Sequence, residues 1–267
     1  MIPALIVIGI LLLAYAAFFL ENRRFVVHRE TIRHPKVTEP FAVVQVSDLH
    51  DRRFGREQEK LLSAVRDAKP DLILITGDLF NRHNKSACEN AFSFIRGAVG
   101  IAPVFFAEGN HECSLGETGE RYIETIRDMG VHVLRDEYTE KGSVRIIGLS
   151  QYASPQQLSA LTDAFRLNLV LAHWPELYPI YADAGADVVL SGHAHGGQIR
   201  VFGIPVFSPG QGIFPRYTSG IYHVGRSLLY VSRGLGNTIP FPRVFNTPEL
   251  NVLIFKPNTE KEHSNVC

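Results

Sequence analysis

The chain has 267 residues, with 27 basic and 27 acidic side chains and 45% hydrophobic residues. This length and hydrophobic content provide a sizeable core, which excludes a predominantly disordered chain. The balanced charge argues against an extended nucleic-acid surface, because such a surface normally carries an excess of Lys and Arg. The three cysteines show no Cys-x-x-Cys spacing, which argues against a disulfide framework and a structural zinc site and fits a reducing compartment.

The N-terminal segment contains a long uncharged run. Residues 2–20 are 19 consecutive residues without a charge, and most of them are apolar. A helix needs about 20 such residues to cross the roughly 30 Å hydrocarbon core of a bilayer. A cleaved signal peptide has basic residues before its apolar run and a small-residue cleavage site after it. The sequence lacks both features, so we expect residues 1–21 to form an uncleaved transmembrane anchor, with a signal sequence or a buried core helix as alternatives.

Basic residues follow the apolar run closely, whereas only the α-amino group precedes it. These residues are Arg23, Arg24, Arg29, Arg33 and Lys36. By the positive-inside rule, we expect a single-pass membrane protein whose large domain lies on the cytoplasmic side. We further expect a basic juxtamembrane linker over residues 22–40, one folded domain over residues 41–257, and a polar C-terminal tail over residues 258–267.

Beyond residue 40, short apolar runs alternate with amphipathic stretches, which is typical of an α/β fold. Nearly continuous apolar runs predict strands covered on both faces at residues 41–46, 72–75, 104–106, 144–147, 169–171 and 188–190. Helical spacing predicts helices at residues 57–68, 86–96, 117–129 and 155–165. Two later strands, residues 228–231 and 250–255, have no helix between them, so the second half is expected to contain a sheet of mixed direction.

Polar side chains stand directly after five of the predicted strands. In chain order they are Asp48 and His50, Asp78, Asn110 and His111, His173, and His193 and His195. In an α/β sheet the carboxyl ends of the strands form the crevice where ligands bind, so we expect these five loops to converge. Glycines at 77, 109 and 192 suit the tight turns that would aim the next side chain inward.

Carboxylate, amide and imidazole groups are the ligands of divalent transition metals. Seven of the strand-end residues offer such groups: Asp48, His50, Asp78, Asn110, His173, His193 and His195. One ion cannot use them all. Two ions could, if one carboxylate bridged them, and two-metal sites about 3.5–4 Å apart recur in phosphoryl transfer.

Each of these residues also has a structural explanation when it is considered alone. A strand-terminal Asp such as Asp48 is commonly a turn or cap residue, and His173 could be a hydrogen-bonded core histidine. Two histidines that flank one residue, as His193 and His195 do, have few structural uses. The joint arrangement favours a metal site, whereas the other histidines are expected to be surface or core residues: His28, His34, His83, His132, His223 and His263.

The strand-end residues form five motifs in order: Asp48-x-His50, Gly77-Asp78, Gly109-Asn110-His111-Glu112, His173 and Gly192-His193-x-His195. This set resembles the five sequence blocks of the calcineurin-like metallophosphoesterases. Residues 192–198 and the run Ser232-Arg233-Gly234-Leu235-Gly236 also resemble the bacterial membrane-associated YkuE- and YaeI-like branch of that family. The resemblance covers nearly all of residues 41–256.

The resemblance implies a four-layer α+β fold, with two mixed β-sheets packed face to face and helices on both outer faces, here preceded by the transmembrane helix. It implies a ligand set of Asp48, His50, Asp78 and His195 for one metal and of Asp78, Asn110, His173 and His193 for the other. His111 would lie over the phosphate, as a general acid or as a transition-state donor. Glu112 stands where many members have Asp, at a position that usually orients His111.

The family's activity implies a metal-dependent phosphoesterase that uses two divalent ions (Mn, Fe or Zn) and metal-activated water to cleave a phosphodiester or pyrophosphate bond. With the expected anchor, a lipid-linked substrate such as UDP-2,3-diacylglucosamine fits, because the same branch includes such enzymes. The alternatives are a general phosphodiesterase or nuclease on the same scaffold, and a non-catalytic interaction module. Zero net charge argues against a nucleic-acid partner, no ligand is missing as it would be in a non-catalytic module, and no protein partner is predicted.

Two further features bear on the substrate. Arg200, Arg233 and Arg243 lie in loop-like stretches late in the chain and are candidates for phosphate binding, since the Arg side chain offers a bidentate fork; a surface location is the alternative. Phe202, Phe207, Phe214 and Phe241 occur among few charges. They predict either core packing or a hydrophobic mouth for an acyl chain.

Overall fold

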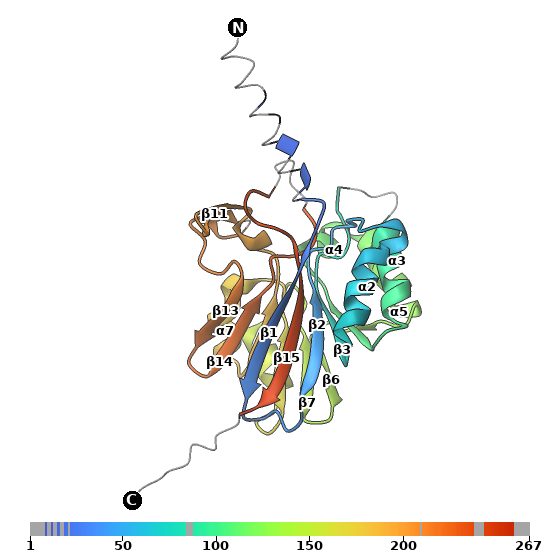
Figure 1. Cartoon of the computed structure of the whole chain (residues 1–267). Helices are drawn as coiled ribbons and strands as arrows, with labels where there is room; N and C mark the ends of the chain where they lie inside the picture. Colours follow the sequence, from blue (N-terminus) through green and yellow to red (C-terminus); the bar gives the residue numbers. More distant parts are fainter. Residues whose placement is uncertain are drawn as a thin grey trace, which may run out of the picture.

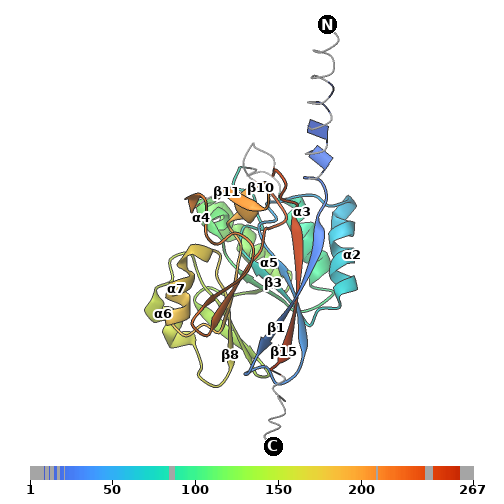
Figure 2. The same ribbon diagram turned by 60° about the vertical axis from the view of Figure 1, so that its left-hand side comes forward.

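The computed structural model describes residues 22–83, 88–208, 210–237 and 243–258, together with Gly9, Leu12, Tyr15, Ala16, Phe19 and Leu20 of the N-terminal segment. Two six-stranded sheets pack face to face, and helices cover both outer faces (Figures 1 and 2). One buried hydrophobic cluster lies between the sheets, and two others lie between a sheet and its helices. For these residues the predicted four-layer α/β arrangement is confirmed.

The first sheet has the strand order β1-β15-β2-β3-β4-β5. Its strands are β1 (Val26–His34), β2 (Phe41–Val46), β3 (Leu72–Thr76), β4 (Val104–Ala107), β5 (His132–Val133) and β15 (Glu249–Pro257). Strands β2 to β5 are parallel, and β15 runs antiparallel to β2. The carboxyl ends of β2, β3 and β4 therefore meet at one edge.

The second sheet has the strand order β13-β14-β9-β8-β7-β6. Its strands are β6 (Glu137–Lys141), β7 (Val144–Gly148), β8 (Leu167–Leu171), β9 (Val188–Ser191), β13 (Gly220–Val224) and β14 (Ser227–Val231). Strands β7, β8, β9 and β14 are parallel, whereas β6 and β13 are antiparallel edge strands. A small third sheet contains β10 (Ile199–Val201), β11 (Ile204–Ser208) and β12 (Gly212–Ile213).

Helices cover the outer face of each sheet. The first sheet is covered by α2 (Glu59–Ala68), α3 (Glu89–Ala98) and α5 (Glu117–Asp128), and the second by α6 (Pro155–Leu161) and α7 (Tyr178–Asp183). The short helices are α4 (Asn110–Ser114) and the 3-10 turns η1 (Arg56–Gln58), η2 (Pro175–Leu177) and η3 (His195–Gly197). The predicted helix over residues 155–165 ends early, because the Asn168 side chain binds the backbone N–H of Asp163 and turns the chain into β8.

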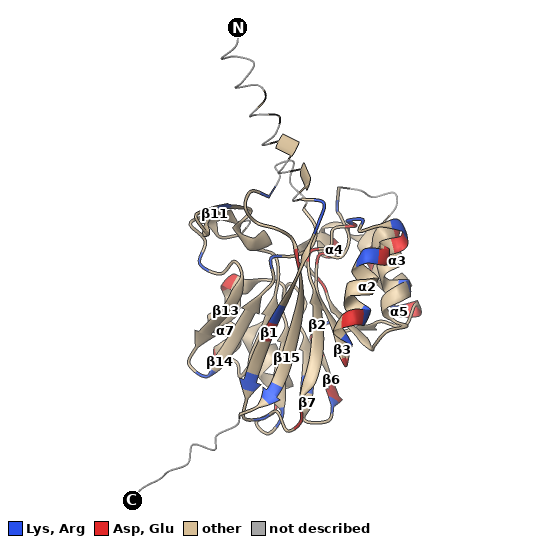
Figure 3. Ribbon diagram, viewed as in Figure 1, with Lys and Arg blue, Asp and Glu red and all other residues tan. Residues whose placement is uncertain are grey.

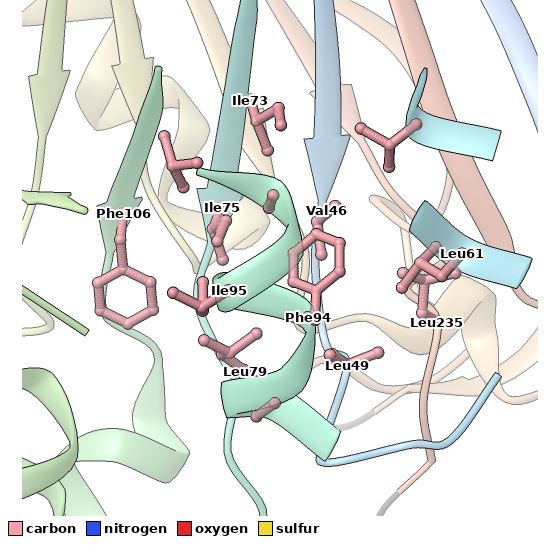
Figure 4. Packing of buried hydrophobic residues seen from close by; sticks show 14 of the residues in the cluster. Val46, Leu49, Leu61, Ile73, Ile75, Leu79, Phe94, Ile95, Phe106 and Leu235 are labelled. Atoms are coloured by element: carbon pink, nitrogen blue, oxygen red, sulfur yellow. The ribbon is translucent and has the colours of Figure 1, made fainter. Parts of the chain in front are cut away.

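The cluster beneath α2 and α3 holds the first sheet against its helices (Figure 4). Ile73 and Ile75 of β3 are fully buried and pack in the same cluster as Phe94 and Ile95 of α3 and Leu61 of α2. Burial of each such side chain contributes about 1.5–3 kcal/mol. The cluster extends to Leu49, Leu79 and Leu235 of the strand-end loops, so the hydrophobic core also anchors the loops that carry the polar residues.

The segment predicted to be a basic linker, residues 22–40, is corrected by the structure. Residues 26–34 form β1, which pairs in parallel with β15 from Val26–Glu249 to His34–Pro257. Most of its side chains are exposed, but Ile32 is buried between the sheets. An edge strand tolerates charged side chains on its solvent side, which explains how a basic segment can belong to the folded domain.

The predicted N-terminal transmembrane helix is not borne out. Within the described part of the chain, no helix has both the length and the apolar character needed to cross a bilayer. The predicted single-pass membrane localisation, with its cytoplasmic catalytic domain, is contradicted by this finding. Only a few separate positions of the apolar run belong to the described residues, and these positions form no continuous helix. Most of the predicted tail, residues 259–267, also lies outside them.

Candidate metal centre

All five strand-end loops converge at the edge that the two large sheets share. Three overlapping groups of buried side chains lie within ligand distance of one another, and each group could hold an ion. They are Asp48 with His50 and His195, His50 with Asp78 and His111, and Asp78 with His173 and His193. The first sheet supplies residues 48–111 and the second supplies residues 173–195, so the site exists only where both sheets meet.

One half of the site is formed by Asp48, His50 and His195. Asp48 Oδ1 lies 3.5 Å from His195 Nε2 and 3.9 Å from His50 Nε2. The two imidazole Nε2 atoms lie 3.2 Å apart. Asp48 is held in place because its carboxylate accepts the Ser47 hydroxyl at 2.6 Å and the backbone N–H of His193 at 3.1 Å.

Asp78 occupies the centre of the site. Its Oδ2 lies 3.8 Å from His50 Nε2, 3.9 Å from His111 Nε2 and 3.3 Å from His173 Nε2. Its other oxygen, Oδ1, accepts the backbone N–H of His111 at 2.8 Å. A single carboxylate oxygen therefore faces imidazoles from both halves of the site, which is the placement expected of a bridging ligand.

The other half contains His173, Asn110 and His193. His173 Nδ1 donates to the Thr76 carbonyl at 2.8 Å, which directs Nε2 toward Asp78 and toward Asn110 Oδ1 at 3.2 Å. A backbone acceptor of this kind fixes the ring orientation of a ligating histidine. His193 is buried between the rings of His173 and Trp174, with centroid distances of 5.0 and 4.0 Å.

The backbone at the site is strained. Asp48, His50, Asp78, His193 and His195 all have φ between 47° and 64°, a region that non-glycine residues adopt at a cost of about 1–3 kcal/mol each. Such strain clusters at functional sites, where the surrounding structure holds it in place.

The glycines next to these residues allow close approach. A Cβ at Gly192 would lie 1.9 Å from Ser47 Oγ, and one at Gly109 would lie 2.3 Å from Asp78 Oδ1. Of the three glycines predicted to lie in tight turns, Gly77 alone also has a positive φ, at 86°. The role of these glycines is therefore mainly steric. Gly192 lies so close to the loop of Asp48, and Gly109 so close to that of Asp78, that a side chain would not fit at either position.

Burial controls the charge of most imidazoles in the site. It lowers the pKa of His111 to about 4 and that of His193 to about 3, and it holds the pKa of both His50 and His195 well below the ordinary value. These rings are therefore neutral near pH 7. Neutral imidazole is the form that ligates metals.

The carboxylates respond to burial and to His173. Burial raises the pKa of Asp48 to about 6, against the opposing charge of His173. Burial acts to raise the pKa of Asp78 as well, but His173, His50 and His111 hold it well below its ordinary value. For His173, burial acts to lower the pKa, but the charges of Asp78 and Asp48 outweigh it and raise the pKa to about 10. The two buried carboxylates thus attract positive charge, which the protonated ring of His173 supplies here; a bound cation would take over that role and release the His173 proton.

The residues present fit divalent cations. Among the described residues, Asp48 and Asp78 have imidazoles but no Lys or Arg within ion-pair distance. His193 Nε2 is buried and has no hydrogen-bond partner within that part of the chain. An unpaired buried nitrogen is costly unless a ligand satisfies it. The neutral nitrogen donors and buried carboxylates together match the preferences of Mn²⁺, Fe and Zn²⁺.

Glu112 has a different role from the one the resemblance implies. It does not orient the His111 ring; its carboxylate instead accepts the backbone N–H groups of Asp78 at 2.9 Å, Phe80 at 3.1 Å and Gly109 at 2.8 Å. His111 Nδ1 is positioned by the backbone N–H of Arg82, at 3.2 Å. Glu112 therefore ties the loops after β3 and β4 together.

The sequence interpretation missed Ser47 and Thr76, which hold Asp48 and His173 through their hydroxyl and carbonyl groups respectively. Both are polar residues at the last positions of buried strands or directly after them. A signal was therefore present for Ser47, whose side chain forms the bond, but not for Thr76, whose backbone carbonyl would be present with any residue there. Asp51 accepts the backbone N–H of Ala91 near the start of α3 at 2.9 Å.

The predicted substrate contact is corrected for Arg243. Its side chain is fully buried, and it donates to the carbonyls of Gly236 at 2.5 Å, Arg233 at 2.5 Å and His195 at 3.4 Å. It therefore supports the loop of His195 from behind. Arg200 donates to the carbonyls of Gly196 and Gly203, and the guanidinium of Arg233 lies 3.4 Å from Glu249.

Replacing Arg243 by Met is expected to lower the free energy of unfolding by about 3 kcal/mol or more, because several buried carbonyls would lose their donor. Urea unfolding followed by circular dichroism measures this change. Arg226→Met, at an exposed position, is the control and should change stability by less than about 0.5 kcal/mol. Equal stability of the Arg243 variant and the wild type would show that these hydrogen bonds are dispensable.

The fold and the clustered carboxylates and imidazoles define a metal-dependent phosphoesterase. A model of the calcineurin-like phosphoesterase family matches residues 41–197, and the chain belongs to this family. It is 32% identical to phosphodiesterase YaeI of Escherichia coli K12, over 80% of this chain and 82% of that protein. It is 30% identical to the metallophosphoesterase YkoQ of Bacillus subtilis, over 78% and 81% of the two chains. These matches confirm the predicted family and hydrolase class.

Two other similarities bear on the branch and on the fold. The metallophosphoesterase YkuE of Bacillus subtilis is 28% identical over 90% of this chain and 88% of its own length. The solved structure of the Thermus thermophilus sulfate thiohydrolase SoxB has a TM-score of 0.50 at 13% identity, covering 87% of this chain and 57% of that one. That structural likeness shows a shared fold alone. The similarity to YaeI and YkuE confirms the predicted bacterial branch.

Proposed function

We propose that the protein hydrolyses phosphodiester bonds with two divalent cations held at the candidate metal centre. One cation would be held by Asp48, His50, Asp78 and His195, and the other by Asp78, Asn110, His173 and His193. The observation that carries this proposal is the position of Asp78 Oδ2, which lies 3.3 to 3.9 Å from imidazoles of both halves of the site. When bound, the two cations would supply Lewis-acid stabilisation of the phosphoryl oxygens and lower the pKa of an attacking water.

His111 would donate a hydrogen bond to the substrate. Its Nδ1 accepts the backbone N–H of Arg82, so the proton of the neutral ring resides on Nε2. That Nε2 faces Asp78 Oδ2 at 3.9 Å and therefore points into the site. Of the two roles left open by the sequence, this geometry supports a hydrogen-bond donor to the oxygen on which charge develops.

A diester is the proposed substrate class because phosphodiesterase YaeI is a relative of this chain. The finer proposal is a lipid-linked diester or pyrophosphate. Apolar side chains near β10 to β12 are exposed, with Phe202 at 100%, Phe214 at 73% and Ile213 at 73%. Core packing of Phe202 and Phe214 is thereby excluded, whereas Phe241 lies outside the described residues. Such a surface next to η3, which begins with His195, would suit an acyl chain.

The test is metal analysis of the purified full-length protein followed by assays in one preparation. The expected result is about two divalent ions per chain, with elemental analysis separating Mn, Fe and Zn. Bis(4-nitrophenyl) phosphate should be cleaved faster than 4-nitrophenyl phosphate, and chelation should abolish both activities. Absence of metal-dependent hydrolysis would refute the proposal. Activity on the generic diester but none on UDP-2,3-diacylglucosamine would refute the proposed lipid-linked substrate alone.

A further inference from the structure

A strongly basic cavity is lined by the loop that follows Asp48 and His50. It has a volume of about 910 Å³. Five cationic side chains line it, and its other lining residues are uncharged: the cations are Arg23, Arg52, Arg53, Arg56 and Lys60. Figure 3 shows basic segments at this end of the molecule, where the N-terminal segment meets the domain. We call this cavity the basic pocket.

The basic pocket keeps a net positive charge, although the carboxylate of Glu59 lies beside its lining residue Gly55. Within the described residues, the one ion pair that its cations form is between Arg56 and Glu57, at 3.9 Å with both side chains more than 80% exposed. Exposed pairs of this kind contribute little. Since the whole chain has zero net charge, five cations around one cavity are a local concentration and not a consequence of a basic protein.

The loop that carries these cations is held in place by buried hydrogen bonds. Gln58 is fully buried; it accepts the backbone N–H of Phe54 at 2.8 Å and donates to the carbonyl of Arg52 at 2.6 Å. The guanidinium of Arg52 donates to the carbonyl of Asn22. These bonds fix the backbone of the loop and the position of Arg52, so an anion entering the pocket would not need to order the loop, which lowers the entropic cost of binding.

The basic pocket adjoins the loop of Asp48 and His50. The backbone N–H of Arg52 donates to the carbonyl of Leu49 at 2.8 Å. On the other side, Asn237 follows Gly236, whose N–H donates to the carbonyl of Asp48 at 2.5 Å. Two of the three segments that line the pocket, residues 52–60 and residue 237, therefore start within two residues of a proposed metal ligand or of its direct backbone partner.

We propose that the basic pocket is a subsite for a second phosphate group of the substrate, beyond the phosphate that is cleaved. This inference rests on the proposed diesterase function and adds a substrate class, namely phosphodiesters that carry a further phosphate. Arg side chains bind phosphate through their planar fork, and Lys binds it as a point charge. None of these cations belongs to the metal centre, so their effect is on selectivity and not on the chemical step.

The test compares two probes that differ by one phosphate. Thymidine 5′-(4-nitrophenyl phosphate) and its 3′-phosphorylated derivative both release 4-nitrophenolate. The full-length triple variant Arg53→Gln, Arg56→Gln, Lys60→Gln changes exposed side chains alone. It is expected to raise KM for the 3′-phosphorylated probe roughly tenfold, with kcat retained and KM for the other probe changed less than about twofold.

A matched control removes the same charge elsewhere. Arg121→Gln, Arg127→Gln, Lys141→Gln changes three exposed cations outside the basic pocket and should leave both KM values unchanged. The proposal is overturned if the wild type has the same KM for both probes, or if the triple variant raises both KM values equally. If the wild type cleaves neither probe, the proposed function fails separately. Calorimetric binding of thymidine 3′,5′-bisphosphate should then still weaken in the triple variant, and equal binding would overturn the subsite.

Discussion

Replacing Asp78 by Asn is expected to lower kcat/KM for a phosphodiester by roughly 10³-fold or more, since metal ions stabilise the transition state by several kcal/mol. Asp78 Oδ2 lies within 3.9 Å of imidazoles from both halves of the site, so loss of its charge weakens both proposed ion positions. Elemental analysis of the variant should therefore show fewer bound ions than the wild type. Steady-state kinetics on bis(4-nitrophenyl) phosphate measures the loss of activity.

The control for this variant is Asp128→Asn, which removes an exposed carboxylate at the end of α5. It should retain both activity and metal content. A melting temperature of the Asp78 variant near or above that of the wild type would indicate that the fold is intact. Wild-type activity in such a folded variant would rule out Asp78 as the shared ligand.

Replacing His111 by Ala is expected to lower kcat by roughly 10²- to 10³-fold, the usual contribution of one positioned hydrogen-bond donor to a developing charge, while metal content stays close to that of the wild type. The reason is that His111 Nε2 points into the site, whereas its Nδ1 is already bound to the backbone N–H of Arg82. The ring can therefore serve the substrate without serving as a ligand of either proposed set. Metal analysis and kcat measured on the same sample separate these two effects.

His223→Ala provides the matched control, because this histidine is exposed on β13. It should change kcat by less than about twofold. If the His111 variant lost metal in proportion to activity, His111 would be a ligand, as the group of His50, Asp78 and His111 within ligand distance also allows. If it kept wild-type turnover on an activated diester, the donor role would be wrong.

Much of the architecture was predictable from apolar runs. The strands that became β2, β3, β4, β7, β8 and β9 were found because strands covered on both faces must be apolar along their length. The strand β1 was not predicted, because it lies at the edge of its sheet. Charged residues such as Arg29 are tolerated there, and the segment therefore resembles a linker in the sequence. Sequence patterns report burial, and an edge strand has little of it.

The candidate site was also largely visible in the sequence, for a related reason. Asp48, Asp78 and His173 follow buried strands, and a polar residue at the end of such a strand points to a shared crevice. The supporting roles were not visible. Glu112 tying two loops together, Arg243 bracing the loop of His195, and the left-handed backbone of the ligands all depend on neighbours from distant segments.

By itself, then, the sequence determined the fold class, the family and the chemical groups at the strand ends, because these follow from local hydrophobic patterning and from residue type. The tertiary structure decided which other residues hold the groups at the strand ends in place. Asn22 and Arg243 exchange hydrogen bonds across 221 positions of the chain, and the basic pocket joins residue 23 to residues 52–60 and 237. Contacts of such separation leave no periodic trace along the chain, since they arise when the sheet brings distant strands and loops side by side.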